Sequence, residues 1–91
     1  MYLEIVSPEA SLVAGEIESI TLPGMDGEFQ VLNNHAAIVS LLSEGKVAFA
    51  GSATIAPGYE NKFIRQDGKW VLEISGGTVE MNNNKVIVLA D

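Results

Sequence analysis

The sequence predicts an all-β fold: a flattened antiparallel β-sandwich of about ten short strands, in which residues 1–91 form a single domain. Turn-forming residues recur at short intervals, from Ser7-Pro8 near the start to Asn82–Asn84 near the end. Between them lie runs of about five to eight residues, the usual length of a strand, and several runs alternate apolar and polar side chains. Short alternating runs separated by regular turns are typical of sandwiches and barrels.

Alternation indicates which side chains of several strands face the interior. Phe29 and Val31 share one face of segment 27–31, and Glu28 and Gln30 share the other, as expected for a strand with one buried face. The same pattern places Trp70, Leu72 and Ile74 together on one face of segment 69–74, and Val79 and Met81 together on one face of segment 78–81.

Three segments lack this clear alternation. Ala36–Ser43 is short for a helix and has the β-branched Ile38 and Val39 at its centre, so we expect a strand there. Val86–Leu89 is continuously apolar, which predicts a strand covered on both faces. Gly51–Gly58 is rich in small residues and is expected to form an irregular loop or a long hairpin tip.

Several corners carry residues that tolerate positive φ. Asp67-Gly68 and Asn82–Asn84 are expected hairpin corners for this reason, and Gly15 is another expected turn. Gly76-Gly77 is not followed by the Lys-Ser/Thr pair of a phosphate-binding loop, so we interpret it as a turn or bulge where another backbone comes close.

Composition excludes several classes of protein. The chain is 47% hydrophobic, enough for one thin core, and it contains no cysteine for a disulfide or a thiolate metal site. The start, MYLEIVSPE, lacks the features of a signal peptide. The longest apolar stretch, Val86–Ala90, is far shorter than the roughly 20 residues of a membrane-spanning helix. We therefore expect no direct membrane insertion, and any tie to a membrane goes through a protein partner.

The net charge of −7 is concentrated in the first half of the chain. Residues 1–45 contain seven acidic side chains and no Lys or Arg, whereas residues 46–91 contain five of each sign. This distribution serves solubility alone, or it prepares the first half to meet a basic partner surface. Nucleic acid and anionic lipid are disfavoured partners, because both require a basic patch.

The sequence offers no catalytic or metal-binding constellation. His35 is the only histidine, and no acid or nucleophile stands at a recognisable spacing from it, so it either settles a corner by hydrogen bonding or contacts a partner. Asp26 and Glu28 flank Gly27, but no further oxygen ligands follow as a calcium loop needs. We predict a non-catalytic protein with no metal and no cofactor.

Two stretches resemble a known family. Residues 22–47 read LPGMDGEFQVLNNHAAIVSLLSEGKV, similar to the pattern P-G-x-x-G-E-[FL]-x-[IV]-x-x-x-H-A-x-[IL]-x-[ST]-x-L-x-x-G-x-[VI] of the first domain of the ATP synthase epsilon subunit. SGGTVE from Ser75 and KVIVLAD from Lys85 resemble the end of the same domain. The chain departs from the pattern at Asn33-Asn34, where the family has Pro-Gly, and segment 51–58 is longer than usual.

The resemblance implies a rotor subunit of the central stalk, which couples the gamma subunit to the c-ring for proton-driven ATP synthesis without chemistry of its own. It places Ser7, His35 and Ser40 at the gamma subunit. It places Met25, Asp26 and Glu28 at the c-ring, whose loops present a basic residue. It also implies a peripheral location at the cytoplasmic face of the cell inner membrane.

One further departure concerns the end of the chain. Typical family members continue past V-L-A-D into a helical hairpin that inhibits hydrolysis and in some members binds ATP, whereas this sequence stops at Asp91. We therefore expect no nucleotide site and no helix-based inhibition. The alternative to a rotor subunit is a free-standing β-sandwich module that binds carbohydrate or protein through its acidic half.

Overall fold

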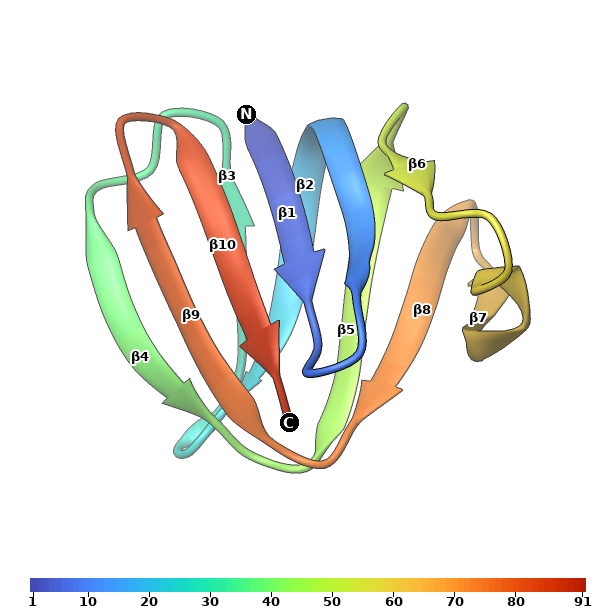
Figure 1. Ribbon diagram of the computed structural model, residues 1–91. Helices are drawn as coiled ribbons and strands as arrows, with labels where there is room; N and C mark the ends of the chain where they lie inside the picture. Colours follow the sequence, from blue (N-terminus) through green and yellow to red (C-terminus); the bar gives the residue numbers. More distant parts are fainter.

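Ten strands and one short 3-10 helix make up the computed structural model, which describes all 91 residues (Figure 1). The predicted all-β sandwich of about ten strands is confirmed, and so is the strand expected within residues 36–43. The elements are β1 (Tyr2–Val6), β2 (Ser11–Gly24), β3 (Gly27–Leu32), β4 (Ile38–Leu42), β5 (Gly45–Gly51), β6 (Thr54–Ile55), the 3-10 helix η1 (Glu60–Lys62), β7 (Phe63–Gln66), β8 (Lys69–Ile74), β9 (Gly77–Asn82) and β10 (Lys85–Ala90).

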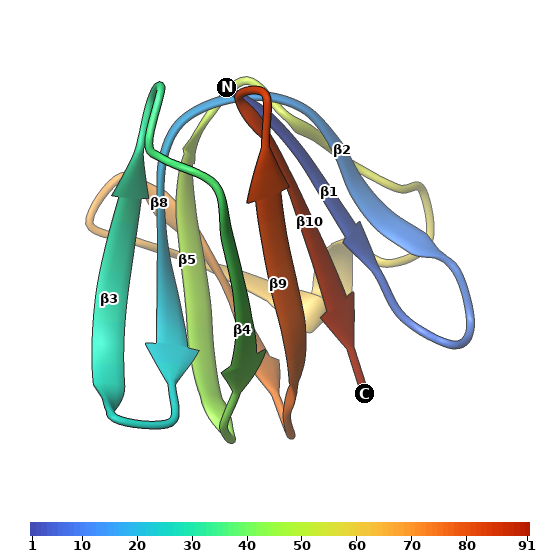
Figure 2. The same ribbon diagram turned by 90° about the vertical axis from the view of Figure 1, so that its left-hand side faces the viewer.

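The strands form one hydrogen-bonded network that folds into two layers (Figures 1 and 2). One layer runs β1-β10-β9-β4, and the other contains β3, β2, β5, β8 and β7. The long strand β2 connects them, because it pairs with β1 along its first half and with β3 and β5 along its second half. All pairings are antiparallel except β1 with β10, which join the two ends of the chain in parallel.

Gly15 lies inside β2, so the turn expected at this residue is wrong. A Cβ atom on Gly15 would lie 2.8 Å from the Cα atom of Ala53, because the segment after β5 passes close by. Within that segment, β6 pairs with β2, so the loop expected for Gly51–Gly58 contains a two-residue strand. The glycine thus permits a close approach of two backbones and does not end the strand.

The core lies between the two layers and contains no buried polar or charged residue. Phe49 is fully buried at its centre and meets Phe63 edge to face, with ring centroids 6.3 Å apart. The alternation predicted from the sequence holds in β9, where Val79 and Met81 are buried, and in β3, where Val31 is buried and Phe29 is half-buried. It is less clean in β8, where Val71 on the opposite face is buried along with Leu72 and Ile74, and Trp70 is half-buried. Each buried side chain among these contributes about 1.5–3 kcal/mol by leaving water.

The final strand departs from its expected environment. Val86 and Val88 are fully buried, but Leu89 on the opposite face of β10 is 50% exposed. The prediction that this strand is covered on both faces is therefore wrong for the isolated chain. A continuous apolar run shows that both faces of a strand are apolar, but it does not show whether the second face is covered by the same chain.

The expected hairpin corners are confirmed. Asp67 and Gly68 join β7 to β8 with φ of 52° and 76°, and Asn83 and Asn84 join β9 to β10 with φ of 51° and 59°. These values lie in the left-handed region that Asn, Asp and Gly enter most readily. Two-residue corners of this geometry match the twist of the flanking strands, which sets the register of both hairpins.

Candidate functional site

The loop that carries His35 joins β3 to β4 at one end of the sandwich. The His35 backbone N–H donates to the carbonyl oxygen of Leu32 over 3.1 Å. Its Nδ1 atom lies 2.8 Å from the carbonyl oxygen of Ala36, a hydrogen bond when Nδ1 carries the proton. The side chain is otherwise exposed, so it has the local contacts expected of a histidine that settles a corner and leaves the rest of its ring free for a partner.

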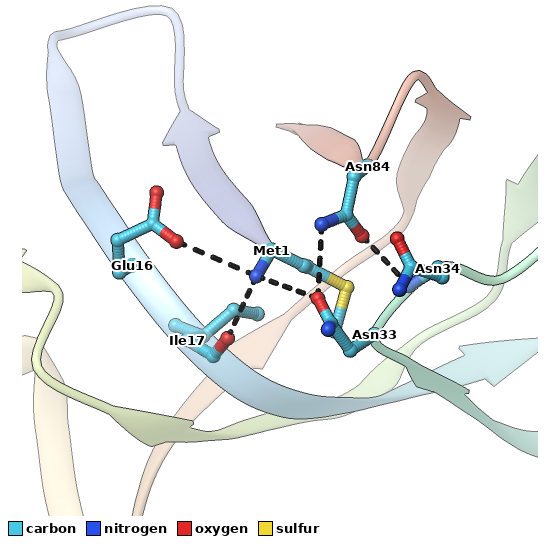
Figure 3. A network of polar contacts seen from close by, with 6 residues as sticks. All are labelled: Met1, Glu16, Ile17, Asn33, Asn34 and Asn84. Carbon is cyan, nitrogen blue, oxygen red and sulfur yellow. Dashed lines mark hydrogen bonds and ion pairs between the residues drawn. The ribbon is translucent and has the colours of Figure 1, made fainter.

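A network of polar groups ties this loop to its surroundings (Figure 3). The side-chain oxygen of Asn33 accepts from the amino group of Met1 over 3.0 Å and from the side-chain amide of Asn84 over 2.9 Å. The Met1 amino group also contacts Glu16 at 3.4 Å and the carbonyl oxygen of Ile17 at 3.2 Å. Asn33 therefore helps connect three separate parts of the chain.

The three residues expected at the gamma subunit do not meet at one point. Ser7 lies in the turn after β1 and bonds within that turn, where its Oγ accepts from the Glu9 N–H over 3.3 Å. The His35 loop lies at the opposite end of the layer β1-β10-β9-β4, next to the start of β1 (Figure 1). Ser40 lies in β4, between these two ends along the strand direction. Ser40 pairs with the buried Val79, so it lies on the inward side of β4, and its neighbours Val39 and Leu41 face outward. Only Ser7 and the His35 loop border the outer surface of the layer β1-β10-β9-β4.

That outer surface carries an apolar patch, which we call the outer apolar face. Leu89 of β10 lies opposite Val6 of β1 and Thr78 of β9, and Thr78 in turn lies opposite Leu41 of β4. A row of side chains thus crosses four strands. A second row contains Ile87 of β10 and Val39 of β4, separated by Glu80. We define the outer apolar face as Val6, Val39, Leu41, Ile87 and Leu89.

Three side chains of this face, Val39, Leu41 and Leu89, are exposed. Val39 is 79% exposed and Leu41 is 62% exposed, compared with 65% for Met25 in the turn after β2. A shallow hollow lies between Val39, Ile87 and Leu89. Clustered exposed apolar side chains mark interaction surfaces more often than isolated ones do. The sequence signals for this face were the apolar run 86–89 and the apolar residues Val39 and Leu41, which alternate with Ser40.

The residues expected at the c-ring lie together at the β2–β3 hairpin, with Met25 and Asp26 in the turn and Glu28 near the start of β3. Met25 is 65% exposed, and Asp26 and Glu28 are also exposed. The connection from β4 to β5 lies at the same end of the molecule (Figure 2) and is tied to this turn. The backbone N–H of Ser43 donates to the Pro23 carbonyl oxygen over 2.8 Å.

The hydrogen bonds from Ser43 to residues 23–24 form what we call the Ser43 clasp. They bring to this end two residues, Ser43 and Glu44, that the sequence did not assign to it. The Ser43 hydroxyl lies 3.3 Å from the carbonyl oxygens of both Pro23 and Gly24. Glu44 follows it and is exposed, so a third carboxylate joins those of Asp26 and Glu28 at this end. No local pattern in the sequence shows that residues 43–44 meet residues 23–24, because the contact spans 19 to 20 positions.

No group of three or more His, Cys, Asp or Glu side chains is placed to hold a metal ion. Every buried side-chain nitrogen or oxygen has a hydrogen-bond partner. The 3-10 helix η1 is the only helix, and it is not long and apolar enough to cross a bilayer. The features that stand out are therefore two surfaces, the outer apolar face and the acidic end at β2–β3.

Comparison with known proteins gives consistent matches. The family model for the ATP synthase delta/epsilon chain, β-sandwich domain, matches residues 1–56. The chain is 35% identical over 91 residues to the ATP synthase epsilon chain of Campylobacter concisus, with 100% of this chain and 60% of that protein covered. It is 33% identical over 89 residues to the epsilon chain of Chlorobium limicola, with 98% and 86% covered. The chain thus spans about 60% of the length of the Campylobacter relative.

Solved structures show the same fold. A chain in the central stalk and c-ring structure of the Tetrahymena thermophila mitochondrial ATP synthase superposes with a TM-score of 0.68 at 15% identity, covering 99% of this chain and 62% of that one. A chain of the Euglena gracilis mitochondrial ATP synthase superposes with a TM-score of 0.72 at 24% identity, covering 97% and 48%.

Proposed function

This chain belongs to the ATP synthase delta/epsilon chain family, and on that premise we propose that it is a rotor subunit of the central stalk. In this role the sandwich is a non-catalytic part that couples the gamma subunit to the c-ring for proton-driven ATP synthesis. It is held at the cytoplasmic face of the membrane through these protein partners. The two surfaces of the sandwich carry the role, one for each partner.

The observation that carries the proposal is the outer apolar face. Its residues lie between Ser7 and the His35 loop, the positions that the family resemblance assigns to gamma. Leu89 and Leu41 would become the buried centre of such an interface, and Ser7 and His35 would form its polar rim. This is the usual anatomy of a stable protein interface, in which an apolar centre excludes water and a polar rim surrounds it.

The acidic end supports the second contact. Asp26, Glu28 and Glu44 place three carboxylates at the end of the sandwich, with exposed Met25 beside them. The Ser43 clasp joins the two connections that carry these side chains, so they form one surface. A basic loop on the ring would complement this surface, and complementary charge chiefly sets register and speeds encounter.

Glu28→Lys tests the ring contact. We expect the domain to fold normally, because Glu28 is exposed and makes no ion pair within the chain. Reversal of its charge would place like charges together at the ring and weaken ring binding about tenfold. ATP-driven proton pumping by the assembled enzyme in membrane vesicles measures the loss. Glu18→Lys, the same charge change at an exposed residue of β2, serves as control. Normal pumping with Glu28→Lys would refute the ring contact.

Binding to the gamma subunit of the same organism tests the proposal as a whole. Co-purification and titration calorimetry should detect a one-to-one complex, with affinity reduced by substitution of His35 or Ser40. Burial of the outer apolar face should also give the complex a negative heat-capacity change. Absence of any complex would reject the rotor role and favour the alternative, a binding module for carbohydrate or another protein.

A further inference from the structure

A single side chain joins the His35 loop to the turn between β9 and β10 (Figure 3). The Asn84 side-chain oxygen accepts from the backbone N–H of Asn34 over 2.7 Å, across 50 positions of sequence. The Asn84 side-chain nitrogen donates to the side-chain oxygen of Asn33 over 2.9 Å. One amide therefore uses its donor and its acceptor on two consecutive residues of the loop, which we call the amide clamp.

The backbone on both sides of the amide clamp has an unusual conformation. Asn34 has a φ of 64° and Asn84 a φ of 59°, so both lie in the left-handed region. Asparagine enters this region more readily than other residues that carry a Cβ atom. The Asn84 carbonyl oxygen also accepts from the backbone N–H of Tyr2 over 3.0 Å, which anchors the corner residue to the adjoining strand β1.

Few other hydrogen bonds hold the loop. The hydrogen bonds that connect residues 33–37 to elements other than β3 are those of Asn33 and Asn34 with Asn84 and with the Met1 amino group. His35 follows Asn34 directly, and Val39 of the outer apolar face is the second residue of β4. The amide clamp thus lies directly before the His35 corner and the entry into β4, which carries Val39 in the second row of the outer apolar face.

From this geometry we infer that Asn84 is a positioning residue for the gamma interface. The amide clamp preorganises the His35 loop, so that docking does not have to order it. A partner that binds a preordered loop avoids the entropy loss of immobilising it, and its affinity is higher for that reason. The inference rests on the proposed function, because it assigns the loop a role at the gamma contact.

Asn84→Gly is the variant that isolates the amide clamp. Glycine adopts positive φ without strain, so the corner persists while the side chain is removed. Asn83→Gly is a matched control, because Asn83 is the neighbouring corner residue with a φ of 51° and its side chain makes no hydrogen bond. Both variants are studied as the full chain by amide hydrogen exchange and by calorimetry with gamma.

The expected result is specific to Asn84. Exchange of the Asn34 and His35 amides should accelerate about fivefold to tenfold in Asn84→Gly, the factor that one lost hydrogen bond represents. Affinity for gamma should fall by a similar factor. The loss caused by His35→Ala should be smaller in the Asn84→Gly background than in the parent chain, because neighbouring residues that act together are not additive.

Three outcomes would overturn the inference and are distinct from one another. Unchanged exchange in Asn84→Gly relative to Asn83→Gly would show that the amide clamp does not order the loop. Faster exchange with unchanged affinity for gamma would show that the ordered loop has no role in docking, while the rotor assignment stands. Absence of gamma binding by the parent chain would reject the rotor assignment together with the docking role.

Discussion

Leu89→Glu is expected to leave the domain folded and to weaken its binding to gamma by about thirtyfold or more. Leu89 lies in the centre of the outer apolar face, between Val6 and Thr78 on the neighbouring strands. A carboxylate there would have to be buried without a partner in the complex. Buried positions near the centre of an interface account for most of its binding energy, and an unpaired buried charge is costly.

The matched control for this variant is Ile64→Glu. Ile64 is 53% exposed in β7 of the other layer, compared with 50% for Leu89 in β10, so the two substitutions place the same charge at similarly exposed aliphatic positions. We expect Ile64→Glu to retain the affinity of the parent chain. Calorimetry with gamma and circular dichroism measure affinity and folding for both. Equal losses in the two variants would refute the assignment of gamma to the outer apolar face.

Gly77→Ala is expected to have the largest effect on stability, a loss of about 3 kcal/mol or more in the free energy of unfolding. Gly77 begins β9 with a φ of 152° and pairs with Ala90 at the end of β10. A Cβ atom at this position would overlap the carbonyl oxygen of Leu89, which is backbone and has no rotamer with which to move away. The end of the β9–β10 pairing would have to open to admit a methyl group.

Gly68→Ala separates this overlap from the cost of backbone strain. Gly68 has a φ of 76° at an open corner, where an added Cβ atom would meet no atom within 4 Å. Alanine there lowers the free energy of unfolding only through the strain of the left-handed conformation, by about 1 kcal/mol. Urea unfolding followed by tryptophan fluorescence compares the two variants through Trp70. Similar losses for both would show that strain, and not close approach, accounts for the requirement for glycine at position 77.

Much of the fold followed from local signals in the sequence. The corners at Asp67-Gly68 and Asn82–Asn84 were predictable because only a few residue types adopt positive φ at low cost. The inner faces of β3 and β9 were predictable because side chains alternate along a strand. The pair Gly76-Gly77 was correctly interpreted as a place of close backbone approach, since a Cβ atom at Gly77 would overlap Leu89.

Other features were outside the reach of the sequence. Gly15 was expected to form a turn, but β2 continues through it, since a glycine inside a strand can also mark a close approach of two backbones. Leu89 was expected to be covered, but the isolated chain leaves it exposed. In both cases the local pattern was compatible with two environments, and the position of a distant segment selected one of them.

The sequence by itself determined that this protein is a β-sandwich of the epsilon chain family, and it identified the candidate contact residues Ser7, His35, Ser40, Met25, Asp26 and Glu28. Only the tertiary structure brought together the outer apolar face, the Ser43 clasp and the amide clamp of Asn84. Strand propensity, turn geometry and alternation act between near neighbours in the chain, so a sequence displays them directly. Surfaces and clamps depend on which strands pair, and β1 meets β10 across almost the whole length of the chain.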